Sequence, residues 1–246
     1  MDPLTLGLIA LLMALAAALY ASVGHGGASA YLAIMALFAL PVEVMRPTAL
    51  TLNLLVAGWA TVVFVRSGQF NLRLFLAFVV TAAPMAWLGG RIDPPEEIYR
   101  PLVGLVLWAA AARLLWRPKQ TATRAIRPPH LAVTLPAGAG LGLLAGLTGT
   151  GGGIFLSPLV VLLGWETARR VSGVAAAFIL VNSAAGLAGA APRLADLPPA
   201  LPLFAAAVVS GGAMGAWLGA DRVPRAGLLV LLGLVLLLAG AKLIFA

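Results

Sequence analysis

Apolar residues dominate most of the chain, in long stretches separated by short polar segments. Several of these stretches approach the roughly 20 residues that a helix needs to cross a bilayer. Two are interrupted by glycine, at Gly24-His25-Gly26-Gly27 and at Gly149-Thr150-Gly151-Gly152-Gly153. Lipid offers no hydrogen-bond partner to the backbone of a broken helix, so such a break must face protein or a cavity. The pattern predicts an all-α polytopic membrane protein with two broken helices.

The second half of the chain repeats features of the first half in the same order. The matched pairs are Gly24 with Gly149, Glu43 with Glu166, Asn53 with Asn182, Trp87 with Trp217, and Gly104 with Gly233. Their separations are 125, 123, 129, 130 and 129 residues. Because the order is kept and the separations stay within 123–130 residues, we infer a duplication. We predict repeat one over residues 1–117, a basic linker over 118–130, and repeat two over 131–246.

Each repeat begins with a tract that is broken by its glycines. The parts after the breaks, 28–40 and 154–164, contain 13 and 11 residues, which is too short for a core about 30 Å thick. We therefore predict re-entrant hairpins, each with its tip near mid-membrane and followed by three full spans. The hairpins cover 4–40 and 131–164, and the spans cover 47–66, 72–91, 100–117, 171–190, 200–220 and 226–245.

Basic residues predict the orientation. The linker carries Arg117, Lys119, Arg124 and Arg127, and short loops rich in Lys and Arg stay in the cytoplasm. Counting spans outward from this linker places both termini outside the inner membrane. A hairpin returns to its own side and three spans follow, so the second repeat is predicted to be inverted. Inverted repeats with broken helices are typical of secondary transporters.

Composition agrees with a membrane protein: 62% of residues are hydrophobic, 10% are charged, and mean hydropathy is +1.04. Cysteine is absent, which excludes disulfides, thiolate metal sites and cysteine-based redox chemistry. The net charge of +8 reflects topology-setting loops rather than nucleic-acid binding. The N-terminus lacks the basic region of a secretory signal. We expect the lipid bilayer and a small anion as partners, and no cofactor or metal.

The breaks have chemistry suited to an anion. The first N–H groups of a helix lack intrahelical partners, and the helix dipole places about half a positive charge there. Glycine lets the backbone approach a ligand closely. Two such ends that meet at mid-membrane would bind an anion from both sides. Neither break continues into a P-loop or a dinucleotide-binding fingerprint.

The candidate substrate-binding residues are the tip glycines, the hydroxyl residues beside them and the two matched asparagines. They are Ser22, Gly24, His25, Gly26, Gly27, Ser29, Asn53, Thr148, Gly149, Thr150, Gly151, Gly152, Gly153 and Asn182. The alternative for the tip glycines is close helix packing. That role fits the small-xxx-small series Gly138/Gly142/Gly146 and Gly211/Gly215/Gly219, through which a homodimer is possible.

Some candidates leave more than one role open. His25 is the ionisable side chain predicted near the bilayer centre; it would contact the anion or couple transport to protons, or it would only bond to backbone carbonyls. Asn53 and Asn182 would line the site or brace the hairpins. The pairs Glu43/Arg46 and Glu166/Arg169 are expected to form ion pairs at the hairpin bases, with gating as the alternative.

The segment Gly149-Thr150-Gly151-Gly152-Gly153-Ile154-Phe155-Leu156-Ser157-Pro158-Leu159 resembles the TauE/SafE family of sulfite and organosulfonate exporters. The duplicated Gly24-His25-Gly26-Gly27 and the matched asparagines share in this resemblance, which covers nearly the whole chain. It implies an inner-membrane permease for small sulfur-containing anions, with the glycine tips as substrate site. One departure is Ala33, which occupies the position of Pro158 in the first repeat.

The favoured function is a secondary transporter that exports organosulfonates, such as sulfoacetate, or sulfite. Membrane potential or proton coupling through His25 would drive it. An anion channel, or a permease for another small carboxylate or inorganic anion, would use the same tips. We expect no enzymatic activity, because GxSxG and HExxH motifs are absent. A purely structural role leaves the duplicated tips unexplained.

Overall fold

The computed structural model describes residues 2–22, 24–115, 126, 129–218 and 225–245. This part of the chain folds into ten α-helices and one short 3-10 helix, and it contains no strand. The helices of the first half are α1 (Pro3–Ala21), α2 (Ala28–Leu37), α3 (Val42–Arg66), α4 (Leu72–Arg91) and α5 (Glu96–Leu115). Those of the second half are α6 (Leu131–Thr148), α7 (Gly153–Leu162), α8 (Ala168–Gly189), the 3-10 helix η1 (Ala191–Asp196), α9 (Leu201–Leu218) and α10 (Arg225–Phe245).

The predicted all-α membrane fold is confirmed. Within the described residues, six helices are long and apolar enough to cross a membrane: Pro3–Ala21, Val42–Arg66, Leu72–Arg91, Glu96–Leu115, Leu131–Thr148 and Arg169–Gly189. The two helices that follow the glycine breaks, α2 and α7, have 10 residues each. Their preceding arms, α1 and α6, have 19 and 18 residues. Each hairpin therefore joins a long arm to a short one.

Glycine conformation forms both hairpin tips. Gly27 and Gly152 precede α2 and α7 with φ of 94° and 77°, and Gly149 ends α6 with φ of 84°. Residues with a Cβ rarely adopt these left-handed values, whereas glycine does so without strain. The chain can therefore end one helix and begin the next within a few residues.

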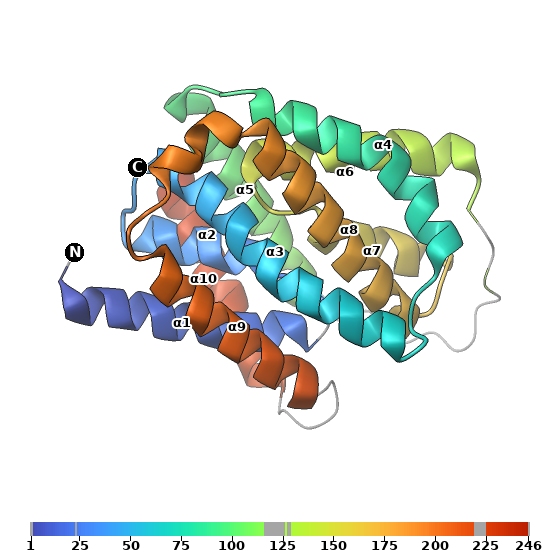
Figure 1. Cartoon of the computed structure of the whole chain (residues 1–246), viewed down its shortest axis with the longest axis horizontal. Coiled ribbons are helices and arrows are strands. Elements are labelled where there is room, and N and C mark those ends of the chain that lie inside the picture. The colour runs from blue at the N-terminus through green and yellow to red at the C-terminus, as the bar shows by residue number, and fades with distance from the viewer. Residues whose placement is uncertain (1, 23, 116–125, 127–128, 219–224, 246) are drawn as a thin grey trace.

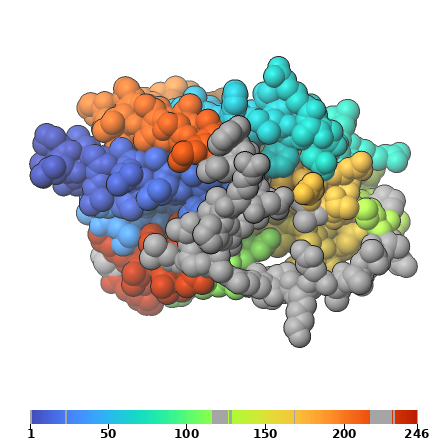
Figure 2. Space-filling view, turned by 90° about the horizontal axis from the view of Figure 1, so that it is seen from below, coloured from blue at the N-terminus to red at the C-terminus, as the bar shows by residue number. Residues whose placement is uncertain are grey.

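The long helices pack in pairs taken from the two halves. Helix α1 packs along α9, α6 along α4, α5 along α10, and α3 along α8. The first helix of each half thus lies against the fourth helix of the other half. Figure 2 shows α1, in blue, beside α9, in orange. In Figure 1 α1 begins at the left and α6 at the right, and both chain ends lie at the left.

Small residues allow these close approaches. A Cβ at Gly138, Gly142 or Gly146 of α6 would overlap the main-chain oxygens of residues 78, 82 and 86 of α4. A Cβ at Gly211 or Gly215 of α9 would overlap the main-chain oxygens of residues 14 and 18 of α1. The predicted packing role is confirmed for these five glycines. Gly219, like the linker residues Arg117, Lys119, Arg124 and Arg127, lies outside the described residues.

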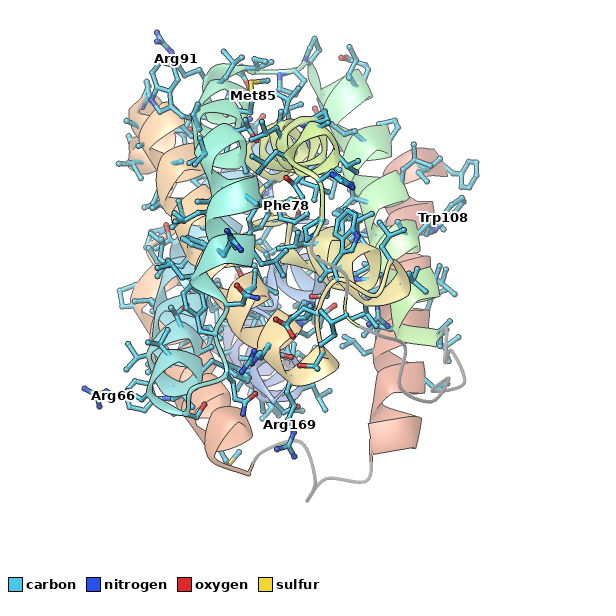
Figure 3. All side chains as sticks on the ribbon, turned by 90° about the vertical axis from the view of Figure 1, so that its right-hand side faces the viewer. Arg66, Phe78, Met85, Arg91, Trp108 and Arg169 are labelled. Carbon is cyan, nitrogen blue, oxygen red and sulfur yellow. The ribbon has the colours of Figure 1, made fainter. Side chains whose placement is uncertain are left out.

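Helix α2 lies inside the bundle, whereas α7 is buried at its start and exposes Val161 and Leu162 at its end. Every residue of α2 from Ala28 to Ala36 is buried, and nearly all of these residues are apolar. The outer faces of the long helices instead expose large apolar side chains such as Leu15, Val80 and Leu105, as expected for a surface that faces lipid. In Figure 3 Arg66, Arg91 and Arg169 lie at the edges of the molecule, while Phe78 lies within it.

Candidate functional site

The two hairpin tips meet around one asparagine and one isoleucine. A Cβ built on Gly26, in the first tip, would overlap Oδ1 of Asn53 and lie 3.1 Å from Cγ2 of Ile179. A Cβ built on Gly151, in the second tip, would lie 2.8 Å from both Nδ2 of Asn53 and Cγ2 of Ile179. Helices α3 and α8 therefore each place one side chain between the tips. Only glycine leaves room for this arrangement.

Asn53 is fully buried and incompletely hydrogen-bonded. Its Nδ2 donates to the main-chain oxygen of Thr150 at 3.5 Å and to Oγ of Ser183 at 3.4 Å, both long contacts. Its Oδ1 has no partner among the described residues. A buried amide atom without a partner costs about 1–3 kcal/mol. Such an atom is favourable only where a ligand or water completes its bonding.

Asn182 has the same property in stronger form. It is 0% exposed, and neither Nδ2 nor Oδ1 has a hydrogen-bond partner in the described part of the chain. Unlike Asn53, it makes no hydrogen bond to a tip. The matched asparagines of the two halves therefore have different surroundings.

His25 reaches across to the other hairpin. Its Nε2 lies 3.1 Å from Oγ of Ser157, a buried residue on α7. The ring of Tyr20 meets the imidazole edge-on, with ring centroids 6.3 Å apart. A polar contact thus joins the first tip to the second short helix.

The hydroxyl candidates divide into local and tip contacts. Ser22 donates to the main-chain oxygen of Leu19 in its own helix, and Ser29 is bonded to the Tyr20 hydroxyl at 2.7 Å. Thr148 and Thr150 are hydrogen-bonded to each other at 2.9 Å beside the second tip. Thr148 also donates to the main-chain oxygen of residue 144. The hydroxyls of Ser22 and Ser29 are therefore hydrogen-bonded to residues of α1, whereas Thr150 lies within the second tip itself.

The remaining tip glycines are close to side chains of other helices. A Cβ at Gly24 would lie 2.6 Å from the main-chain oxygen of Ser172, and one at Gly153 would overlap Ile179. A Cβ at Gly27 would lie 2.7 Å from the Tyr31 hydroxyl, which donates to the main-chain oxygen of Gly26. Gly152 faces Phe178 of α8 in the same way. All the predicted tip glycines thus lie in the centre of the protein.

The two short helices begin without side-chain caps. Neither Gly27 nor Gly152 supplies a side-chain hydrogen bond to the following helix. The first N–H groups of α2 and α7 therefore lack partners within their helices. These donors, the Asn53 amide and the threonine hydroxyls form a polar centre inside an apolar bundle.

The first of the two predicted ion pairs at the hairpin bases does not form. Glu43 is exposed, whereas Arg46 is 2% exposed and donates to main-chain oxygens of Gly90, Ile92 and Leu147. Among the described residues Arg46 has no acidic partner, so the predicted Glu43–Arg46 pair is wrong. In the second half, Glu166 accepts from Asn71 at 2.7 Å and lies 3.9 Å from Arg170. Local spacing missed the main-chain partners of Arg46 and the Asn71 partner of Glu166, because these lie far away along the chain.

Four residues of the centre were not predicted: Ser157, Ile179, Ser183 and Arg46. Ser157 lies within the glycine-proline segment that carries the family resemblance, and Ser183 adjoins Asn182, so both had a weak sequence signal. Ile179 is an ordinary apolar helix residue and had none. In the described part of the chain, no three His, Asp or Glu side chains are grouped so that they could hold a metal.

Comparison with known proteins agrees with this architecture. The family model described as "Sulfite exporter TauE/SafE" matches residues 9–243. The chain belongs to the TauE/SafE family. It is 37% identical over 248 residues to the "Probable membrane transporter protein y4hK" of Sinorhizobium fredii, with all of both chains covered. No solved structure shows a significant match.

Membership of the TauE/SafE family confirms the resemblance seen in the glycine-proline segment. Together with the six long apolar helices, it identifies a multi-pass membrane protein of a transporter family. The matched region includes both hairpins and both asparagines. The polar centre between the tips is therefore part of the region that the family shares.

Proposed function

We propose that this protein is a secondary transporter that exports small sulfur-containing anions, such as an organosulfonate or sulfite, across the inner membrane. The anion is held between the hairpin tips. The observation that carries this proposal is the convergence of Gly26 and Gly151 on Asn53, whose buried Nδ2 makes only two long hydrogen bonds. The family name supports the substrate class.

The site chemistry suits a small oxoanion. Two uncapped helix starts supply N–H donors, and Ser183 supplies a hydroxyl close to Asn53. Such groups favour an anion without requiring its complete desolvation against lipid. Sulfonate, sulfite and carboxylate share this chemistry, so the family name, not the donor set, favours sulfur.

The arrangement of the halves supports alternating access. We infer that the two halves are inverted repeats, since α1 and α6 begin at opposite ends of the molecule and each packs on the fourth helix of the other half. Rocking one half against the other would expose the tips to each side in turn. An inside-negative potential favours export of an anion by about 2.3 kcal/mol per charge per 100 mV. His25 at the first tip is the candidate for proton coupling.

Counterflow in proteoliposomes tests the proposal. Vesicles that contain the purified protein are loaded with unlabelled sulfoacetate and diluted into a trace of labelled sulfoacetate. A carrier accumulates label transiently, and the accumulation saturates. A channel gives equilibration without accumulation. Gly151→Val should abolish accumulation, because a Cβ there meets Asn53 and φ is +72°.

A matched control is Gly140→Val, since nothing lies within 4 Å of a Cβ at Gly140. It should transport like the wild type. Absence of flux with sulfoacetate, sulfite and acetate alike, in protein that is properly inserted, would contradict the proposal. Normal flux in Gly151→Val would show that the tips serve packing alone.

A further inference from the structure

A hairpin tip brings together helix ends of opposite sign. At the second tip α6 ends at Thr148 and α7 begins at Gly153. The C-terminal end of α6 carries about half a negative charge, and the N-terminal end of α7 about half a positive charge. Alone, these two ends nearly cancel. A further positive group beside the second tip would strengthen its attraction for an anion.

Arg46 is placed to supply that group. Its Nη1 donates to the main-chain oxygen of Leu147, in the last turn of α6, at 3.5 Å. The same nitrogen donates to Ile92 at 2.8 Å, and Nη2 donates to Gly90 at 3.2 Å. The guanidinium thus lies against the C-terminal ends of both α4 and α6, where a cation is most stable. It offsets the negative end of α6 and leaves the start of α7 positive.

Part of the guanidinium remains without a partner. Arg46 is 2% exposed, and its Nε has no hydrogen-bond partner among the described residues. Asp93, which adjoins the Ile92 whose oxygen accepts from Arg46, is bonded instead to Arg193. In the described part of the chain, Arg46 is the one basic residue in the buried class. A buried donor on a charged group is costly unless a ligand completes it.

The unpartnered donor lies close to the second tip. A Cβ at Gly149 would be 3.2 Å from Cγ of Arg46, and Nε is two covalent bonds beyond that carbon. Tyr99, on α5, donates to the main-chain oxygen of Thr148 at 3.3 Å beside it. Arg46 thus adjoins Gly149, the glycine that ends α6, and the last turn of that helix.

We propose that Arg46 is a direct contact for the transported anion at the second tip, donating through Nε–H while its Nη groups hold the ends of α4 and α6. The inference rests on the proposed function and adds a permanent positive charge to its site. A guanidinium donates to oxoanions in a fixed, directional geometry, which a lysine ammonium does not reproduce. The contact therefore favours sulfonate, sulfite or carboxylate over chloride.

The test measures methanesulfonate binding to purified protein by thermal stabilisation. A ligand that binds the folded state raises stability by RT ln(1 + [L]/Kd). Arg46→Lys, which keeps the charge, should raise Kd at least about tenfold, because a hydrogen bond to a charged group is worth about 1.5–3 kcal/mol. Arg46→Gln should abolish saturable stabilisation. Arg66→Gln is the matched control, since Arg66 is an exposed residue at the end of the same helix, and its Kd should not change.

Each other outcome has one meaning. If Arg46→Lys has a lower melting temperature but an unchanged Kd, Arg46 only holds helices together and the inference is wrong. If the wild type binds neither methanesulfonate, sulfite nor acetate, the proposed function itself fails. Should Arg46→Gln not fold, Arg46→Lys alone decides. The Arg46 Nε–H NMR signal is identified as the one that Arg46→Lys lacks. In the wild type this signal should shift on titration with methanesulfonate. A signal that does not move would overturn the proposed contact.

Discussion

The amide nitrogen of Asn53 lies against Gly151: a Cβ at that glycine would be 2.8 Å away from it. The oxygen of the same amide lies against Gly26 of the other hairpin. One side chain on α3 thus contacts both tips. The amide is also fully buried and only partly hydrogen-bonded, so it would sense both the position of the tips and a ligand between them.

Gly26→Ala isolates the effect of space at this contact. Gly26 does not have a positive φ, so its backbone tolerates alanine, but the new methyl group would overlap Asn53 Oδ1. We expect transport to fall at least tenfold while insertion is preserved. Proteoliposome flux measures the first and membrane yield the second. Gly140→Ala serves as control, and equal flux in both variants would count against a role for the Asn53 contact.

Asn182 offers a test in which stability and function change in opposite directions. Both polar atoms of its amide are buried without partners in the described structure. Asn182→Leu has similar volume and removes them, so we expect it to be more stable by about 1–3 kcal/mol. If these atoms serve the substrate, flux should fall at the same time. Higher stability with undiminished flux would show that Asn182 does not belong to the site.

His25 predicts a dependence on pH. Protonation adds a positive charge at the first tip and should strengthen anion binding; raising the pH removes that charge and should weaken binding. Ser157 and Tyr20 lie against the imidazole in the structure and carry no charge near neutral pH. We expect the affinity of the wild type to fall as the pH is raised, and that of His25→Gln to be independent of pH. The measurement is Kd against pH for methanesulfonate, and the same fall in both proteins would exclude His25.

Substitution of a glycine at which α6 packs on α4 should destabilise the fold, and not only weaken binding. A side chain at Gly142 would overlap the main-chain oxygen of Ala82, where α6 approaches α4 most closely. Gly142→Val should therefore lower the stability of the protein in detergent by about 1–3 kcal/mol or more. Gly140→Val, two residues away on the open side of the same helix, should be nearly neutral. Melting temperatures of the pair decide the question.

The sequence predicted the parts of the fold that residue type determines locally. Glycine alone accepts the positive φ found at Gly27, Gly149 and Gly152, so the breaks were visible as glycine clusters. The long apolar stretches became long helices, because no other backbone structure is as readily satisfied in lipid. The 3-10 helix Ala191–Asp196 and the start of α3 at Val42 follow no such rule and were not predicted.

Contacts between helices that are distant in the sequence were beyond the sequence pattern. Glu43 and Arg46 have the spacing of a helical ion pair, but Arg46 is buried against the ends of α4 and α6 while Glu43 faces outward. Ile179 and Ser183 lie beside Gly151 because α8 packs on both α7 and α3. The duplication likewise suggested equal roles for Asn53 and Asn182, although their hydrogen bonding differs. Tertiary packing, not repeat position, decides which side chains reach the tips.

The measurement that tests the central claim most directly is anion-dependent thermal stabilisation of the wild type beside Gly151→Ala and Gly140→Ala. Sulfite, sulfoacetate and methanesulfonate are titrated into each protein, with chloride as the reference anion. The account predicts saturable stabilisation of the wild type and Gly140→Ala, and none of Gly151→Ala, in which a methyl group occupies the space beside Asn53. Equal stabilisation of all three proteins would contradict it, because the anion would then bind somewhere other than between the tips.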